Sequence, residues 1–175
     1  MRTSLVTALT AATLLLPVGA ASAAEQPVDD LRTVPGLTAE QKAAVEAVEK
    51  GSGVAVGLAP KTLPGMESAV TGSRRATYYR GSFLMWARDS VDFGYNGRSV
   101  TWTSAYQQAG SVFPNIARNL GIRKYYDTSF NDKFRAANRI GAGVVTPWGD
   151  VTVYTSDYIH RLSVSGNGAW SAWSD

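Results

Sequence analysis

After Thr77, residues 78–86 are a run of strand formers, and apolar and polar residues alternate in three later segments. A period of two buries one face of a strand and exposes the other, which is typical of antiparallel sheets. Turn-forming residues separate these segments closely enough for hairpins and Greek-key returns. We therefore predict a mostly β fold, a small antiparallel Greek-key sandwich. The expected strands are 78–86, 99–103, 151–154 and 161–165, and the expected turns are 94–97, 147–150 and 165–168.

Two other segments of this region are expected to adopt different structures. Residues 116–126 are compatible with a short helix, which Gly121 would weaken. Gly141-Ala142-Gly143 has neither the third glycine nor the βαβ setting of a phosphate-binding loop, so we interpret it as a turn.

The aromatic residues divide the chain into two unequal parts. Every Phe, Trp and Tyr lies at or after Tyr78, and such rings supply most of the buried area of a core. We therefore expect the folded β domain to comprise residues 77–175 and to be preceded by an N-terminal arm over 24–76.

The arm contains one expected helix and one expected linker. The hydroxyl of Thr38 lies three residues before Gln41, which predicts a capped helix that ends at Gly51. The glycines and prolines of 51–72 are typical of a linker. The arm is interpreted as a tether or as a propeptide, because its large apolar residues are too few to form a core. These residues are Leu37, Val45 and Val48.

The first residues have the pattern of an export signal. Arg2 precedes an apolar stretch over 5–18, and Ala21-Ser22-Ala23 supplies the small residues of a cleavage site. The apolar stretch is shorter than the roughly 20 residues that span a bilayer. We therefore predict a signal peptide over 1–23 and a secreted, extracellular protein.

Composition restricts the chemistry of the chain. It contains no cysteine and one histidine, which excludes disulfides, thiolate nucleophiles and multi-histidine metal sites. The formal charge of +3 is too small to favour nucleic acid. Residues 24–50 carry six acids and three bases. Either this acidic arm lies against the basic β domain, or both are solvated surfaces, and we adopt the second interpretation.

One group of motifs resembles a known family. Ser129-Phe130-Asn131-Asp132-Lys133, followed by Asn138-Arg139 and Gly141, resembles the Phe-Asn-Asp-Lys segment of βγ-crystallin-type domains. Trp86 followed by Tyr95-Asn96-Gly97-Arg98 is similar to the aromatic and glycine hairpin of that fold. The nearest form is the secreted bacterial branch assigned to peptidase inhibitor family I36. The resemblance implies a Greek-key fold and inhibition of an extracellular peptidase.

The same resemblance argues against calcium binding. Calcium-binding members carry hydroxyl residues at the positions that Arg135 and Ala136 occupy here. Because an arginine cannot offer a hard cation an oxygen ligand, no metal site is expected.

Candidate catalytic residues are sparse. His160 is the only imidazole and no Gly-x-Ser-x-Gly elbow is present, so we interpret His160 as a surface or interface side chain. A glycosidase requires two carboxylates across a sugar. Asp89 and Asp92, in an expected loop, are the candidates for a small secreted hydrolase. Because acidic loop residues usually form turns, we expect no enzyme.

The sequence thus favours a secreted binding protein without a cofactor. The first hypothesis is inhibition of an extracellular peptidase through a loop at 88–96 or 106–115. The alternative is binding of a cell-wall polysaccharide, on which exposed Trp rings, Trp173 among them, would stack. Neither nucleic acid nor a membrane is expected as partner. The candidate binding residues are Arg88, Asp89, Asp92, Tyr95, Trp102, Trp148 and Trp170.

Overall fold

The computed structural model describes residues 23–57 and 71–175. The expected signal peptide therefore lies almost entirely outside the described residues, and its cleavage stays a prediction. The elements in chain order are β1 (Ala24–Pro27), η1 (Leu31–Thr33), α1 (Ala39–Lys50), β2 (Ser52–Gly57), β3 (Gly72–Ser82), β4 (Met85–Tyr95), β5 (Val100–Ser111), β6 (Ile116–Asp127), β7 (Asn131–Val145), β8 (Val151–Ser165) and β9 (Trp170–Ser174).

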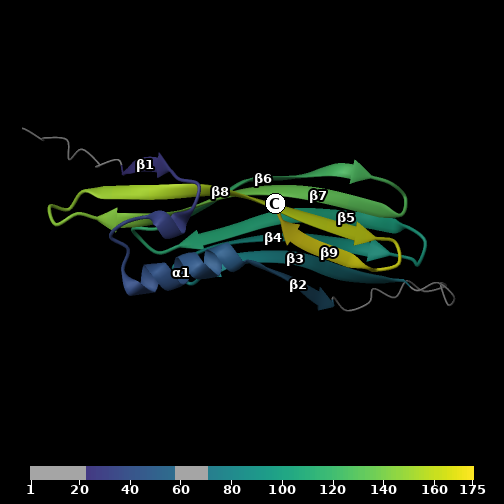
Figure 1. The fold of residues 1–175 in the computed structure, drawn as a ribbon. Coiled ribbons are helices and arrows are strands. Elements are labelled where there is room, and N and C mark those ends of the chain that lie inside the picture. The colour runs from purple at the N-terminus through teal and green to yellow at the C-terminus, as the bar shows by residue number, and fades with distance from the viewer. Residues whose placement is uncertain (1–22, 58–70) are drawn as a thin grey trace, which may run out of the picture.

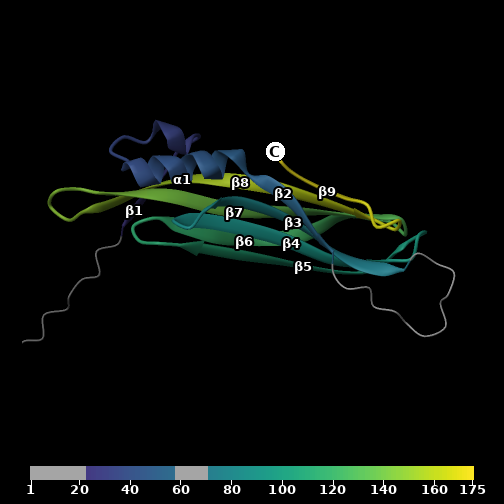
Figure 2. The same ribbon diagram turned by 90° about the horizontal axis from the view of Figure 1, so that it is seen from below.

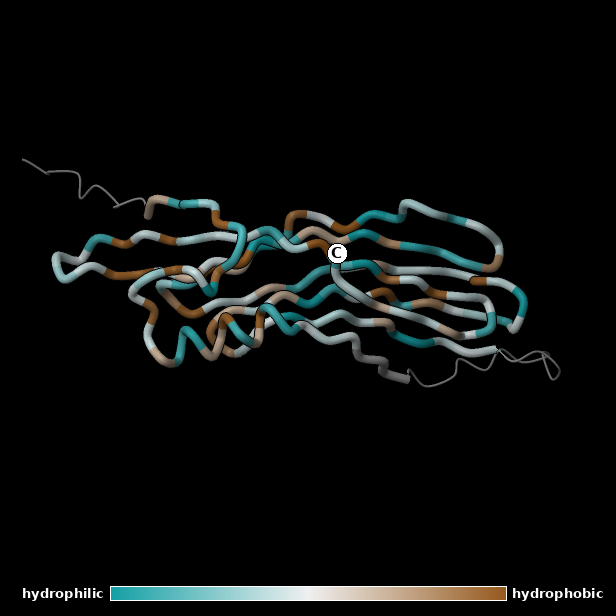
Figure 3. Tube along the Cα trace, in the orientation of Figure 1, coloured by the Kyte–Doolittle hydropathy of each residue, from teal (hydrophilic) through white to brown (hydrophobic). Residues whose placement is uncertain are grey.

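Two mainly antiparallel sheets face each other and enclose the core (Figures 1 and 2). The four-stranded sheet has the order β2-β3-β4-β5. The five-stranded sheet has the order β1-β8-β7-β6, with β9 also paired to β8. Hydrophobic and hydrophilic residues alternate along these strands (Figure 3). The expectation of a mostly β sandwich with a helical arm is confirmed.

The connections differ from the expected Greek key. From β2 to β5, and again from β6 to β8, each strand pairs with the next one along the chain. Among the described strands, β2–β5 and β6–β9 are therefore meanders, because hairpins rather than long returns join these strands. Strand β1 is different, since it comes from the N-terminal arm and pairs in parallel with β8.

Several strands are longer than the alternation indicated. The expected strand 78–86 is divided between β3 and β4, and the two segments expected at 151–154 and 161–165 are parts of the single strand β8. The expected turns are confirmed between β4 and β5, β7 and β8, and β8 and β9. A glycine with positive φ lies in each of them: Gly97, Gly149 and Gly168.

The short helix expected at 116–126 is wrong, because this segment is strand β6. Gly121 has a φ of 115° and follows an irregularity in the pairing of β6 with β7. This backbone conformation is incompatible with a right-handed helix and allows a bulge in the strand.

The turn expected at Gly141-Ala142-Gly143 is also wrong. These residues lie inside β7 and are buried. Pro114 lies so close to Gly143 that a side chain there would collide with its backbone. The glycine therefore permits close packing and does not reverse the chain.

The N-terminal arm is packed into the sandwich. The capped helix is confirmed as α1, which contacts β3, and Leu31, Val45 and Val48 are fully buried. They join Met85 of β4 and Ile140 of β7 in one of two hydrophobic clusters. The arm was expected to lack a core because its apolar residues were considered alone, whereas here they complete a core with the sheets.

The region expected as a linker also contains regular structure. Its described parts contain strand β2 and the start of β3, while residues 58–70 lie outside the described residues. Thr77, where the β domain was expected to begin, is inside β3.

Acidic residues of the arm contact side chains of the five-stranded sheet, one of them basic. Oε1 of Glu25 is 2.6 Å from Nη1 of Arg118, and the hydroxyl of Tyr158 donates to Glu49 at 2.8 Å. Burial, followed by this hydrogen bond, raises the pKa of Tyr158. The interpretation of two independently solvated surfaces is therefore wrong for these contacts. Within the described residues, no helix is long and apolar enough to cross a membrane.

Candidate binding face

Strand β4 directs two different sets of side chains to its two sides. Asp89 is buried, whereas its neighbour Arg88 is exposed, because successive side chains of a strand point to opposite faces. The pairing places Tyr79 of β3 and Gln108 of β5 beside Arg88. We call this outer surface of the four-stranded sheet the aromatic face. It comprises Arg75, Thr77, Tyr79, Trp86, Arg88, Ser90, Asp92, Trp102, Tyr106 and Gln108.

Indole rings lie near both ends of the aromatic face. Trp86 packs against Gly110, where an added Cβ would be 2.8 Å from the ring. Trp102 packs against Gly94, where an added Cβ would be 2.1 Å from its Nε1. These two glycines allow the rings to lie against the backbone of the neighbouring strand. Gly94 is eight residues from Trp86 on β4, so the face extends over about 27 Å.

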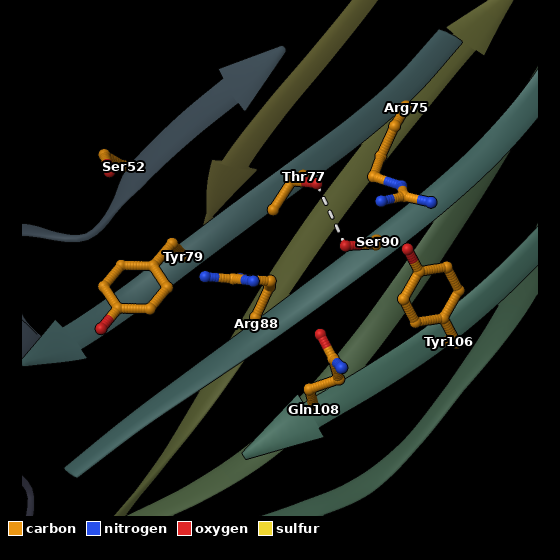
Figure 4. Close-up of a pocket in the computed structure, with 8 residues that line it drawn as sticks. All are labelled: Ser52, Arg75, Thr77, Tyr79, Arg88, Ser90, Tyr106 and Gln108. Atoms are coloured by element: carbon orange, nitrogen blue, oxygen red, sulfur yellow. Dashed lines mark hydrogen bonds between the residues drawn. The ribbon is translucent and has the colours of Figure 1, made fainter. Parts of the chain in front are cut away.

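A shallow pocket of about 340 Å³ lies in the middle of this face (Figure 4). The hydroxyls of Thr77 and Ser90 are 3.0 Å apart in its floor. The guanidinium of Arg88 lies 5.5 Å from the ring centre of Tyr79 and 5.7 Å from that of Trp86. The pocket therefore combines aromatic surface, neutral hydroxyls and two guanidinium groups, those of Arg75 and Arg88.

The second arginine of the pocket is neutralised by a carboxylate. Arg75 donates to both oxygens of Asp92, at 2.6 and 2.9 Å, and lies 5.5 Å from the ring centre of Tyr106. The hydrogen bond from Arg75 to Asp92 raises the pKa of Arg75. In contrast, Arg88 forms no ion pair with any carboxylate of the described residues. Its cation is available to a ligand.

The structure brings three of the seven candidate residues together. Arg88, Asp92 and Trp102 all belong to the aromatic face, and Trp102 is 46% exposed. Tyr95 and Trp170 are partly buried against the second hydrophobic cluster. Trp148 is 87% exposed in the turn between β7 and β8, away from the strands that form the aromatic face. The seventh candidate, Asp89, lies inside the sandwich.

Asp89 is part of a polar network between the two sheets. Its carboxylate accepts from Gln107 at 2.7 Å and from Asn138 at 2.6 Å, and lies 2.5 Å from Nδ1 of His160. Nε of Arg80 lies 2.9 Å from Nε2 of His160. Because an arginine can only donate, Nε2 accepts this bond and Nδ1 carries the proton that is donated to Asp89. The neutral imidazole thus connects a buried cation to a buried anion.

This network corrects the expectations for His160 and for the acidic residues. His160 was expected to be a surface or interface side chain, yet it is 0% exposed inside the sandwich, and Arg80 donates to its Nε2, the nitrogen that would activate a serine. Asp89 and Asp92 are three residues apart on one strand and therefore point to opposite faces. They do not form a pair of carboxylates across a sugar.

Sequence reasoning missed most residues of the aromatic face. Residues 88–96 and 106–115 were expected as loops, but they lie mainly in β4 and β5. The signal was the alternation that places Trp102, Tyr106 and Gln108 at even-numbered positions of one strand. No metal-binding group of three or more His, Asp or Glu side chains occurs in the described part of the chain.

Comparisons with protein-family models, curated proteins and solved structures found no match to this chain. The resemblance to βγ-crystallin-type peptidase inhibitors therefore stays a prediction.

Proposed function

We propose that this chain is a non-catalytic polysaccharide-binding protein whose ligand lies along the aromatic face. The observation that carries the proposal is the row of four aromatic residues, Tyr79, Trp86, Trp102 and Tyr106, on one face of three adjacent strands. A pyranose ring has an apolar face, which packs on an aromatic ring, and hydroxyls at its edge. The hydroxyls and amide of the pocket match that edge.

The layout of the face favours an extended and mainly neutral polymer. Its rings are distributed over about 27 Å of strand, which is longer than a single sugar. Arg75 and Asp92 neutralise each other, so Arg88 is the one unpaired charge among its described side chains. Such a site depends on stacking and on hydrogen bonds and needs little charge attraction.

The peptidase-inhibitor hypothesis is less favoured by this geometry. An inhibitor presents an extended loop to a protease cleft, and a rigid scaffold reduces the ordering cost of that loop. Both ranges expected to supply such a loop lie mainly in paired strands. We expect stoichiometric amounts of the protein to leave serine, cysteine and metallopeptidases active. Loss of activity in any of these classes would restore the inhibitor hypothesis.

Removing single rings from the aromatic face is expected to weaken polysaccharide binding. Trp102→Ala and Tyr106→Ala should each reduce affinity about 10-fold, since large aromatic side chains often dominate a binding surface. Because the two rings are separate, the double variant should lose about 100-fold. The measurement is depletion of protein from solution by insoluble chitin, cellulose or purified peptidoglycan.

The matched control is Trp148→Ala, which removes an exposed indole from the hairpin between β7 and β8. Its binding should equal that of the unmodified chain. Absence of binding to all three polymers, or an equal loss in the Trp148 variant, would contradict the proposal.

A further inference from the structure

The outer surface of the five-stranded sheet carries a cluster of cations. Arg123 of β6 pairs with Arg135 of β7, and Arg135 pairs with Arg161 of β8. Lys133 lies two residues from Arg135 on the same face of β7. We call these four residues, Arg123, Lys133, Arg135 and Arg161, the basic face.

Sequence reasoning missed this cluster. In the sequence, Arg123 and Lys124 are an isolated basic doublet, but the pairing of the strands aligns Arg123 with two further arginines. Lys124 points to the other face, where its Nζ lies 2.6 Å from Asp132. The available signal was the alternation of Lys133, Arg135 and Arg139 along one strand.

Only part of this charge is neutralised. Arg161 donates to Asp175 at 2.7 Å, and this hydrogen bond raises the pKa of Arg161. Arg123, Lys133 and Arg135 form no ion pair with the described carboxylates. The basic face therefore carries three uncompensated cations.

The two arginines next to the basic face, Arg118 and Arg139, form ion pairs with carboxylates and so mark where the uncompensated charge ends. Arg139 donates to both oxygens of Asp157. Nη1 of Arg118 lies 2.6 Å from Glu25 of the arm. The acidic groups Asp157 and Glu25 thus neutralise the cations beyond one end of the basic face and leave Arg123, Lys133 and Arg135 uncompensated.

Like charges on directly opposite residues of a sheet are destabilising. Arg123 and Arg135 are such a pair, and neither forms an ion pair, whereas Arg161 on the other side of Arg135 is paired with Asp175. Folding gains nothing from this arrangement. A negatively charged ligand on the basic face would remove the repulsion between Arg123 and Arg135.

Two tyrosines next to the basic face, Tyr125 and Tyr126, pack against its cations. Arg161 lies 5.3 Å from the ring centre of Tyr125, and Lys133 lies 5.0 Å from that of Tyr126. These rings are therefore already covered on one side by cations. This disfavours nucleic acid, because single-stranded binding sites offer free aromatic rings to the bases.

We propose that the basic face binds an anionic polymer with regularly spaced phosphodiester groups. Arginine suits this chemistry because its planar guanidinium forms two parallel hydrogen bonds to one phosphate. A second copy of the chain is a poor occupant, since the aromatic face has no uncompensated carboxylate and two basic faces repel each other. This site lies on a different sheet from the aromatic face and does not depend on the proposed polysaccharide binding.

The test uses the triple variant Arg123→Gln, Lys133→Gln and Arg135→Gln with poly(glycerol phosphate) as the probe. For the unmodified chain, raising the salt from about 50 to about 200 mM should weaken binding about 20-fold, if three phosphates of this single-stranded polymer release their counterions. The triple variant should lose most of its affinity at low salt together with this salt dependence. A variant with lysine at the two arginine positions should retain the salt dependence and bind more weakly, because lysine keeps the charge without the planar fork.

The matched control removes three cations from other surfaces: Lys42→Gln, Lys50→Gln and Arg98→Gln. It has the same net charge as the triple variant and should bind like the unmodified chain. Thermal unfolding of all variants establishes that each is folded. The proposal is overturned if the control variant loses as much affinity as the triple variant of the basic face, or if the unmodified chain does not bind the polymer at low salt. It is also overturned if a single-stranded oligonucleotide or anionic lipid vesicles bind more tightly than poly(glycerol phosphate).

Discussion

Replacing Arg80 with methionine is expected to reduce the free energy of unfolding by about 3–5 kcal/mol, the usual cost of breaking a buried ion pair from one side. Arg80 is 4% exposed. Through the neutral ring of His160, its guanidinium balances the carboxylate of Asp89. Methionine retains much of the volume but leaves that carboxylate without a cation inside the sandwich.

The loss should exceed that of one hydrogen bond because Arg80 connects several elements. Its Nη1 donates to the carbonyl of Val48 in α1 at 2.5 Å, and its Nη2 donates to Ser174 of β9 at 2.7 Å. The substitution therefore also leaves polar groups at the ends of α1 and β9 without this donor.

Urea unfolding followed by circular dichroism measures this effect. The control is Arg88→Met on the outer side of the next strand, which should change the free energy of unfolding by less than about 0.5 kcal/mol. In the double variant Arg80→Met, Asp89→Leu, the loss should be smaller than the sum of the two single losses, because neither charge is left alone. An additive double variant, or a loss below about 1 kcal/mol for Arg80→Met, would show that the network does not act as a charge pair.

The substitution Leu31→Ala is expected to destabilise the chain by about 2–5 kcal/mol, as for other fully buried leucines. Leu31 is 0% exposed, although it lies in the arm. It packs in the cluster that includes Val48 of α1 and Ile140 of β7. Truncation removes its burial and leaves a cavity that the surrounding sheets cannot fill completely.

Leu120→Ala is the matched control, because Leu120 is 49% exposed on β6. It should alter the free energy of unfolding by less than about 0.5 kcal/mol. If Leu31→Ala were as neutral as the control, the arm would behave as a tether or a propeptide, the two interpretations from the sequence, and its contacts would contribute little to the fold.

The sequence predicted the mostly β fold because its alternating segments are half-buried strands. It predicted helix α1 because the spacing of Thr38 and Gln41 indicated a capping box, which the structure contains. It did not reveal strand β4. The stretch from Arg88 to Asp92 contains two acidic residues and resembles a loop, yet Asp89 is stabilised inside the sandwich by partners on β5, β7 and β8. Those partners are 18 to 71 residues away, so no local pattern indicates them.

The candidate site was predictable residue by residue but not as a surface. Exposed Trp102 and charged Arg88 were identified from their types, whereas their grouping with Tyr79 depends on the register of three strands. Register is determined by which side chains enter the core and by the hairpins. The basic face has the same origin, because Arg123, Arg135 and Arg161 belong to three different strands.

Side chains of β4 alternate between the aromatic face and the interior of the sandwich, which restricts the insertions and deletions that this strand can tolerate. A single residue inserted between Trp86 and Asp92 would turn the remainder of the strand by one position. When the insertion precedes Arg88, it would direct the cation of Arg88 inward and the carboxylate of Asp89 outward, so the charge offered to a ligand and the polar interior would be lost in one event. Natural or engineered length changes should therefore be tolerated in the hairpin ends, and inside this strand only when they occur in pairs of residues.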